Sequence, residues 1–248
     1  MRRRRTTPRI LDVSVRILTI TIFWPIAAMP AAPTPEATGR IEGRVTFQGA
    51  PPPLMTVGET GEAQPTLYVD AAGGLRYAVV YLPDARAAGP PATKPAIVNQ
   101  RNFIFEPQVL AVRAGRMVRF TSDDVANHNV RAKGTTPVNT FFISTAPGST
   151  GSATRAFAAT PPDRPVPLSC DIHPWMAAWI YVFDHDAFAV TAPDGRFEID
   201  DVRPGRYRVA VRQPSGPLAR DLAIDVRADA PTRLDVRFTD ADLGTPGR

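Results

Sequence analysis

Apolar residues alternate with polar ones in short runs along most of this chain. The first run is Gly39–Phe47, where polar residues separate Ile41, Val45 and Phe47, as expected of a half-buried strand. Similar runs follow, and turn-forming residues such as Ala192–Gly195 separate them. Beyond the first 32 residues, no apolar pattern has the 3.6-residue period of a helix. The chain is therefore predicted to be all-β.

The predicted strands fall into three blocks. The first covers residues 39–82 and ends at the Pro/Ala/Gly-rich segment 83–95, which has the composition of a connector. The second covers residues 102–183, and its short strands have the spacing of a β-sandwich. The third covers residues 187–238. This division predicts more than one β-sheet domain.

The first 32 residues have the pattern of a secretory signal peptide. Six arginines precede the apolar run Ile17–Met29, and small residues and prolines follow it. The run is too short to span a bilayer comfortably, and Pro25 interrupts it. We therefore expect residues 1–32 to direct export, with a periplasmic or otherwise exported protein that is not embedded in a membrane. An uncleaved N-terminal anchor is the alternative.

The charge of the whole chain comes from this N-terminal segment. The sequence has 29 basic and 24 acidic residues, a formal net charge of +5. Residues 1–32 hold six of the arginines and one acid, so the remainder carries 23 of each and is neutral. The positive charge therefore gives no reason to expect nucleic-acid binding. The single cysteine excludes an internal disulfide.

That cysteine lies in a loop with other metal-binding side chains. The segment Ser169–Met176 lies between two strand-like runs and contains Cys170, His173 and Met176, with two residues between each and the next. His128 starts an earlier predicted strand and can reach the same point, because distant strands meet in a sandwich. Two histidines, a cysteine and a long axial methionine are the ligand set of blue copper sites. Zinc could also use the cysteine and the two histidines, but it has no need of the thioether. The alternative to a metal site is that the cysteine and methionine are ordinary core residues.

Residues 103–183 resemble the cupredoxin family, and in particular the plastocyanin, pseudoazurin and amicyanin group. The loop pattern is Cys, two residues, His, Pro, an aromatic residue and Met, and the segment from Phe105 to Phe120 is similar to the strands before the first copper histidine. The resemblance implies a Greek-key β-sandwich over residues 96–185 that holds one type-1 copper ion.

The resemblance also assigns roles to individual residues. It implies that the copper ligands are His128, Cys170, His173 and Met176. It implies that Asn129 ties the two ligand loops together by hydrogen bonds. It further implies that His173 exposes its edge through an apolar patch where redox partners dock, and Pro174 and Trp175 can supply that patch. Packing of Trp175 beneath the loop is the alternative.

The flanking blocks resemble complementary parts of a carboxypeptidase-regulatory-like (transthyretin-like) β-sandwich. Gly39–Phe47 and Tyr77–Leu82 are similar to its first strands, and the turns at Asp194–Phe197 and Pro204–Tyr207 are similar to its later ones. We therefore predict a second, smaller sandwich formed by residues 37–95 and 186–248, into which residues 96–185 are inserted. Two consecutive domains with an N-terminal extension are the alternative.

These features predict an exported electron carrier rather than an enzyme. By resemblance its partner is a redox protein: a cytochrome, a dehydrogenase or a copper enzyme. A copper carrier, and a binding module with structural copper, remain alternatives. Three further groups are interpreted as solvated turns, namely Asp184-His185-Asp186, Asp123-Asp124 and Asp200-Asp201. A weak cation site is the alternative for Asp184-His185-Asp186.

Overall fold

The regular elements that the structure describes are β-strands, with one exception. The computed structural model covers residues 37–86, 89–133, 138–142, 153–161 and 163–243, so the predicted signal peptide lies outside it. The exception is a short 3-10 helix, η1 (Asp240–Asp242). The all-β prediction is therefore confirmed. No helix in the covered ranges is long and apolar enough to cross a membrane.

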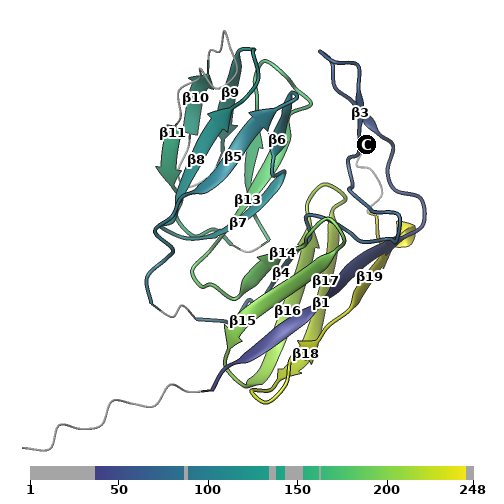
Figure 1. The fold of residues 1–248 in the computed structure, drawn as a ribbon, viewed down its shortest axis with the longest axis vertical. Coiled ribbons are helices and arrows are strands. Elements are labelled where there is room, and N and C mark those ends of the chain that lie inside the picture. Colours follow the sequence, from purple (N-terminus) through teal and green to yellow (C-terminus); the bar gives the residue numbers. More distant parts are fainter. Residues whose placement is uncertain (1–36, 87–88, 134–137, 143–152, 162, 244–248) are drawn as a thin grey trace, which may run out of the picture. The chain divides into compact units, whose positions relative to one another are not determined.

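Strands between residues 96 and 183 form two sheets, which we call the inner sandwich (Figure 1). The sheets have the strand orders β11-β8-β5-β6 and β10-β9-β12-β13-β7. The strands are β5 (Ala96–Arg101), β6 (Ile104–Glu106), β7 (Val109–Arg113), β8 (Met117–Ser122), β9 (His128–Ala132), β10 (Val138–Phe142), β11 (Ala153–Ala156), β12 (Val166–Ser169) and β13 (Ala177–Phe183).

The two sheets of the inner sandwich share one apolar core. In β8, Val118 and Phe120 are fully buried whereas Arg119 between them is exposed, which is the period-two pattern of a strand with one face inward. β13 is different, because most of its residues are buried. Ile180 faces this core, while Tyr181 packs in a different apolar cluster. Burial on both faces explains the continuous apolar run of β13.

Strands from both ends of the described chain pair with one another in two further sheets, which we call the outer sandwich. One sheet has the order β15-β1-β18, with β19 also paired to β1, and the other has the order β14-β4-β16-β17. One core cluster contains residues of both sheets. The strands are β1 (Gly39–Gln48), β4 (Val79–Tyr81), β14 (Phe188–Val190), β15 (Arg196–Val202), β16 (Gly205–Gln213), β17 (Leu218–Val226), β18 (Thr232–Arg233) and β19 (Val236–Thr239).

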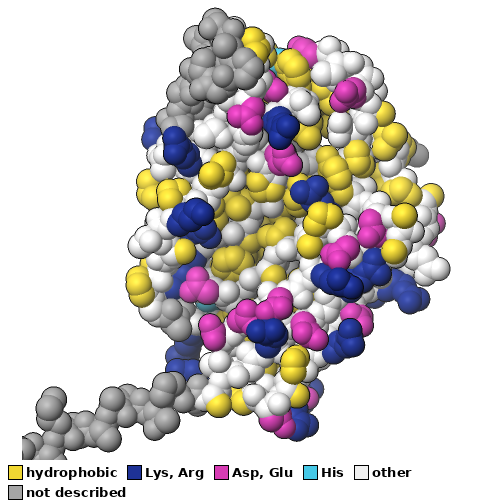
Figure 2. Space-filling view, in the orientation of Figure 1, with side chains coloured by type: hydrophobic (Ala, Val, Ile, Leu, Met, Phe, Trp, Pro, Cys, Tyr) yellow, Lys and Arg dark blue, Asp and Glu magenta, His cyan; other side chains and the backbone are white. Residues whose placement is uncertain are grey.

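Aromatic residues of β4 and β13 link the two sandwiches. Tyr81 packs against Phe183 with ring centroids 4.9 Å apart, and both belong to one buried cluster with residues of β7 and β16. In Figure 2 apolar side chains gather in the middle of the face shown, over β7 and β14. Asp163 adds polar contacts, since it accepts hydrogen bonds from the Tyr81 hydroxyl at 3.3 Å and from Arg212 at 2.8 Å. Burial raises the pKa of Tyr81, so its hydroxyl stays protonated.

His185 extends this aromatic cluster, and its interpretation as a solvated residue is wrong. The side chain is buried, and its ring lies 5.3 Å from that of Phe183. Its Nδ1 atom accepts a hydrogen bond from the backbone N–H of Ala187 at 3.2 Å. Burial lowers the pKa of His185 and favours the neutral imidazole. The flanking carboxylates gave a polar pattern that concealed the apolar surroundings of the ring.

A double-mutant cycle tests the pairing between the two ends of the chain. Ile41 of β1 and Ile199 of β15 are cross-strand partners and are both buried. We expect Ile41→Ala and Ile199→Ala each to lower the free energy of unfolding by about 2–5 kcal/mol. Because the residues are neighbours, the double variant should depart from additivity by about 0.5–3 kcal/mol. As a control, Val118→Ala lies in the core of the inner sandwich, so its loss in the free energy of unfolding should add to that of Ile41→Ala. Denaturant unfolding measures all of these values.

Candidate metal centre

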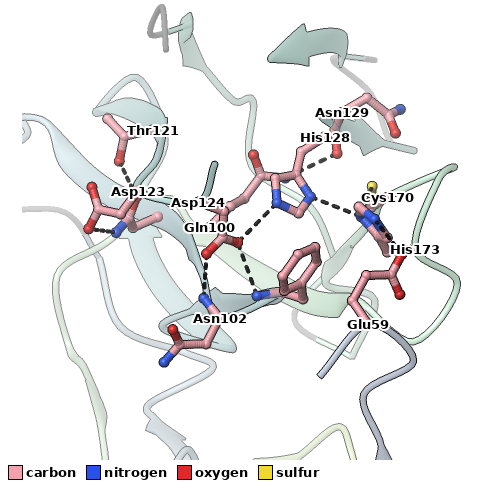
Figure 3. Close-up of polar contacts among 12 residues, drawn as sticks. Glu59, Gln100, Asn102, Thr121, Asp123, Asp124, His128, Asn129, Cys170 and His173 are labelled. Carbon is pink, nitrogen blue, oxygen red and sulfur yellow. Dashed lines mark hydrogen bonds and ion pairs between the residues drawn. The ribbon is translucent and has the colours of Figure 1, made fainter. Parts of the chain in front are cut away.

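Three potential metal ligands from two distant segments meet in the inner sandwich (Figure 3). The Nδ1 atoms of His128 and His173 lie 3.0 Å apart, and the Cys170 Sγ atom lies 3.6 Å from His173 Nδ1. Ligand atoms of the three residues all lie within 4.8 Å of one another, and the three side chains are buried. The structure therefore brings together two imidazoles and the only thiol of the chain.

The strand order explains this meeting. His128 is the first residue of β9, and Cys170 follows directly after β12. β9 and β12 are antiparallel neighbours, so the start of one lies beside the end of the other. The loop to β13 closes on itself, because the N–H of Cys170 donates to the carbonyl of Met176 at 3.3 Å and the N–H of Met176 donates to that of His173 at 3.0 Å. The Met176 side chain is buried in the same core cluster as Cys170.

Asn129 joins the two segments by direct hydrogen bonds. Its Oδ1 atom accepts from the backbone N–H of Asp171 at 2.6 Å, and its Nδ2 atom donates to the Asp171 carboxylate at 2.8 Å. The carbonyl of Asn129 accepts from the buried Gln100 amide at 3.2 Å. Asn129 therefore connects the segment of His128 to the segment of Cys170.

Asp124 holds His128 from the other side, and its interpretation as a solvated turn is wrong. Its Oδ2 atom lies 2.9 Å from His128 Nε2, and its carboxylate accepts the backbone N–H groups of Asn102 at 2.6 Å and Phe103 at 3.0 Å. A carboxylate that accepts the second N–H of a ligating histidine fixes the tautomer and ring orientation. The i, i+4 spacing of Asp124 and His128 is the sequence signal that could have indicated this role.

For both His128 and Cys170, burial and hydrogen bonding shift the pKa in opposite directions. Burial lowers the pKa of His128, but hydrogen bonds with Asp124 and Cys170 outweigh it and raise the value to about 9. Burial raises the pKa of Cys170, but hydrogen bonds from His128 and nearby backbone N–H groups bring it below its ordinary value. The surroundings therefore favour the thiolate, which is the form that binds metals.

Aromatic side chains cover the group. The Phe103 ring makes edge contacts with both imidazoles, at centroid distances of 5.5 Å to His128 and 5.2 Å to His173. Trp175 lies 5.4 Å from His173, and its Nε1–H donates to the carbonyl of Phe103 at 3.1 Å. These rings exclude water from the ligand atoms. Trp175 is half-buried in this packing, whereas Pro174 beside it is exposed.

The edge of His173 is not exposed as the resemblance implies. The side chain is 4% exposed. Its Nε2 atom lies 3.2 Å from a carboxylate oxygen of Glu59, a residue that the sequence did not single out. Burial lowers the pKa of His173, and the charge of His128 adds to this effect. The roles of His173, Pro174 and Trp175 in docking a partner stay predictions.

The donor set fits a copper ion. Two nitrogens that each lie about 2.0–2.1 Å from one metal ion are at most about 4 Å apart, and the separation of 3.0 Å between the two Nδ1 atoms satisfies this limit. Both imidazoles present the same ring atom to one point, with their Nε2 atoms turned to carboxylates. Two imidazoles and a thiolate beside a buried methionine are the donor types of a type-1 copper site.

Comparison with known proteins gives fold neighbours of low similarity. No family model matches the sequence, and no curated protein matches it. A purple cupredoxin from Nitrosopumilus maritimus is 18% identical over 35% of this chain and 98% of its own, with a TM-score of 0.29. An oxidised variant of amicyanin is 15% identical over 42% and 97%, with a TM-score of 0.30. A copper-containing nitrite reductase from Thermus scotoductus SA-01 is 20% identical over 55% and only 28% of its own chain, with a TM-score of 0.31.

The link between the two ligand segments can be tested at Asn129. We expect Asn129→Ala to lower the free energy of unfolding by about 1–3 kcal/mol, because it removes the side-chain partner of both the Asp171 N–H and the Asp171 carboxylate. Asn99→Ala is the matched control, since the Asn99 side chain also makes two hydrogen bonds, to Asp123 and from Thr121, but neither joins the two ligand segments; it should cost less. Denaturant unfolding measures both. Equal losses for the two variants would contradict a special connecting role for Asn129.

Proposed function

We propose that this chain is an exported type-1 copper protein that carries single electrons between redox partners. The observation that carries the proposal is the convergence of His128 Nδ1, His173 Nδ1 and Cys170 Sγ on one buried point. The family resemblance of residues 103–183 and the signal-like pattern of residues 1–32 support it.

In this proposal each side chain has a distinct role. Cys170 would hold the ion as a thiolate, and His128 and His173 would bind it through Nδ1. Met176 would supply a weak thioether ligand. When bound, the copper ion supplies the one-electron chemistry. Asp124 and Asn129 hold the ligands in place, so that little rearrangement accompanies a change of charge at the site.

The partner in this proposal is another redox protein, such as a cytochrome, a dehydrogenase or a copper enzyme. The aromatic cover from Phe103 and Trp175 keeps the ligand atoms away from water. Such burial suits a site that exchanges electrons through its protein surface. It is less suited to one that binds and transforms a substrate at the metal.

Replacement of the thiolate tests the copper site. With Cu(II) added, the protein should show an intense visible thiolate-to-copper charge-transfer band, and Cys170→Ser should abolish it because the serine oxygen is a poor substitute for the soft sulfur ligand. Ser169→Ala, at the neighbouring position, should keep the band. Visible absorption titrated with Cu(II) is the measurement. A wild-type protein without the band would overturn the proposal.

Replacement of Met176 tests its proposed role as a copper ligand. Met176→Leu conserves volume but removes the thioether, so we expect the protein to keep its copper and colour. The loss of a donor and the more apolar surroundings disfavour the more highly charged Cu(II), and the reduction potential should rise. The control is Met117→Leu, which makes the same change at a partly exposed position of β8 and should leave the reduction potential unchanged. A potential unaffected by Met176→Leu would remove Met176 from the ligand set.

Electron exchange separates this function from copper transport. An electron carrier should exchange electrons rapidly between its own oxidised and reduced forms and should retain copper in the presence of a chelator. Rapid loss of copper with slow electron exchange would favour the copper carrier instead.

A further inference from the structure

We propose that Glu59 is a positioning residue of the copper centre, supplied by the N-terminal flank, which fixes His173 and closes its outer edge. This proposal rests on the proposed function. Glu59 lies in the hairpin of β2 (Met55–Thr56) and β3 (Ala63–Gln64), more than 100 residues before His173. Figure 3 shows its carboxylate beside the His173 ring, on the side away from His128.

The contact places the negatively charged carboxylate of Glu59 beside the second nitrogen of the His173 imidazole. The Glu59 carboxylate oxygen is 3.2 Å from His173 Nε2, whereas His173 Nδ1 faces His128 and Cys170. A carboxylate in this position holds the proton on Nε2, leaves Nδ1 free for the metal and raises the basicity of the ligand. Asp124 makes the equivalent contact with Nε2 of His128. Each imidazole of the centre therefore has its own carboxylate.

The turn of the hairpin packs against the loop between β12 and β13. A Cβ atom at Gly58 would lie 2.5 Å from the Trp175 ring, so the ring packs directly on the backbone there. The turn is closed by hydrogen bonds from the N–H of Val57 to the carbonyl of Glu62 at 2.9 Å and from the N–H of Gly61 to that of Val57 at 2.8 Å. Glu59 thus extends from a defined turn, and His173 is almost fully covered although Glu59 itself is 43% exposed.

The consequences for copper follow from charge and hydrogen bonding. A more basic imidazole and a nearby negative charge both stabilise Cu(II) more than Cu(I). Loss of Glu59 should therefore weaken Cu(II) binding and shift the redox equilibrium towards Cu(I). Loss of the cover should also speed removal of copper by a chelator.

The test uses the whole chain with three substitutions on one hairpin. Glu59→Ala removes charge and acceptor, whereas Glu59→Gln keeps an oxygen acceptor and removes the charge. Glu62→Ala removes an equal charge from an exposed position that makes no contact with His173. Competition with a chelator should show about tenfold weaker Cu(II) binding for Glu59→Ala, an intermediate value for Glu59→Gln and no change for Glu62→Ala. The Cu(I) to Cu(II) ratio at equilibrium with a reference couple should rise most for Glu59→Ala, less for Glu59→Gln and not at all for Glu62→Ala.

A measurement without metal separates this proposal from the proposed function. Imidazole nitrogen NMR should report His173 protonated on Nε2 in the wild type, and Glu59→Ala should change the Nε2 chemical shift because the carboxylate acceptor of this N–H is lost. Absence of the charge-transfer band in the wild type would defeat the copper function, and with it the role of Glu59 in a copper centre. A normal band, with Glu59→Ala and Glu62→Ala giving the same affinity, redox equilibrium and NMR spectrum, would overturn the proposal for Glu59 alone.

Discussion

The paired hydrogen bonds between Asn129 and Asp171 are the constraint on which the candidate centre depends. They hold the start of β9 against the loop after β12, although the two residues are 42 positions apart. Because both bonds use one amide group, they fix distance and rotation together. His128 and Cys170 are the chain neighbours of this pair, so their side chains are set relative to one another before any metal contributes.

Burial of polar ligands would be unfavourable without the partners that surround them. An unpaired imidazole or thiolate in an apolar core costs several kcal/mol by general estimates. Here Asp124 accepts from two backbone N–H groups at a turn where Asn102 and Phe103 have φ values of 52° and 58°. Those bonds help hold residues in a sparsely populated conformation, and the same turn places the Phe103 ring over both imidazoles. One carboxylate therefore orients the His128 ring and holds the turn that carries its apolar cover.

The sequence predicted best what is encoded locally. Period-two alternation predicted the strands, and the Cys170, His173 and Met176 spacing marked the loop, because these signals lie within a few residues. The meeting with His128 needed the general knowledge that distant strands adjoin in a sandwich. Glu59 was missed because its partner is more than 100 residues away and an isolated glutamate in a turn resembles any solvated one. His185 was misread because its local surroundings are polar while its tertiary surroundings are apolar. Asp124 was misread because its backbone partners Asn102 and Phe103 lie 22 and 21 residues before it.

The flanking segments cannot be treated as independent of the inner sandwich. Tyr181 and Phe183 of β13 and Val109 of β7 are buried in a cluster that also contains Tyr81 and Ala210 from the flanks. Without the flanks these apolar side chains would lose cover, which a soluble single domain rarely tolerates over a large area. The continuous apolar run of β13 is therefore explained by two neighbours, the inner core and the outer sandwich. The same dependence extends to the candidate metal centre, since the hairpin that covers His173 also lies outside residues 96–185. The transthyretin-like resemblance of the outer sandwich stays a prediction, but its strands contribute directly to the surroundings of the inner one.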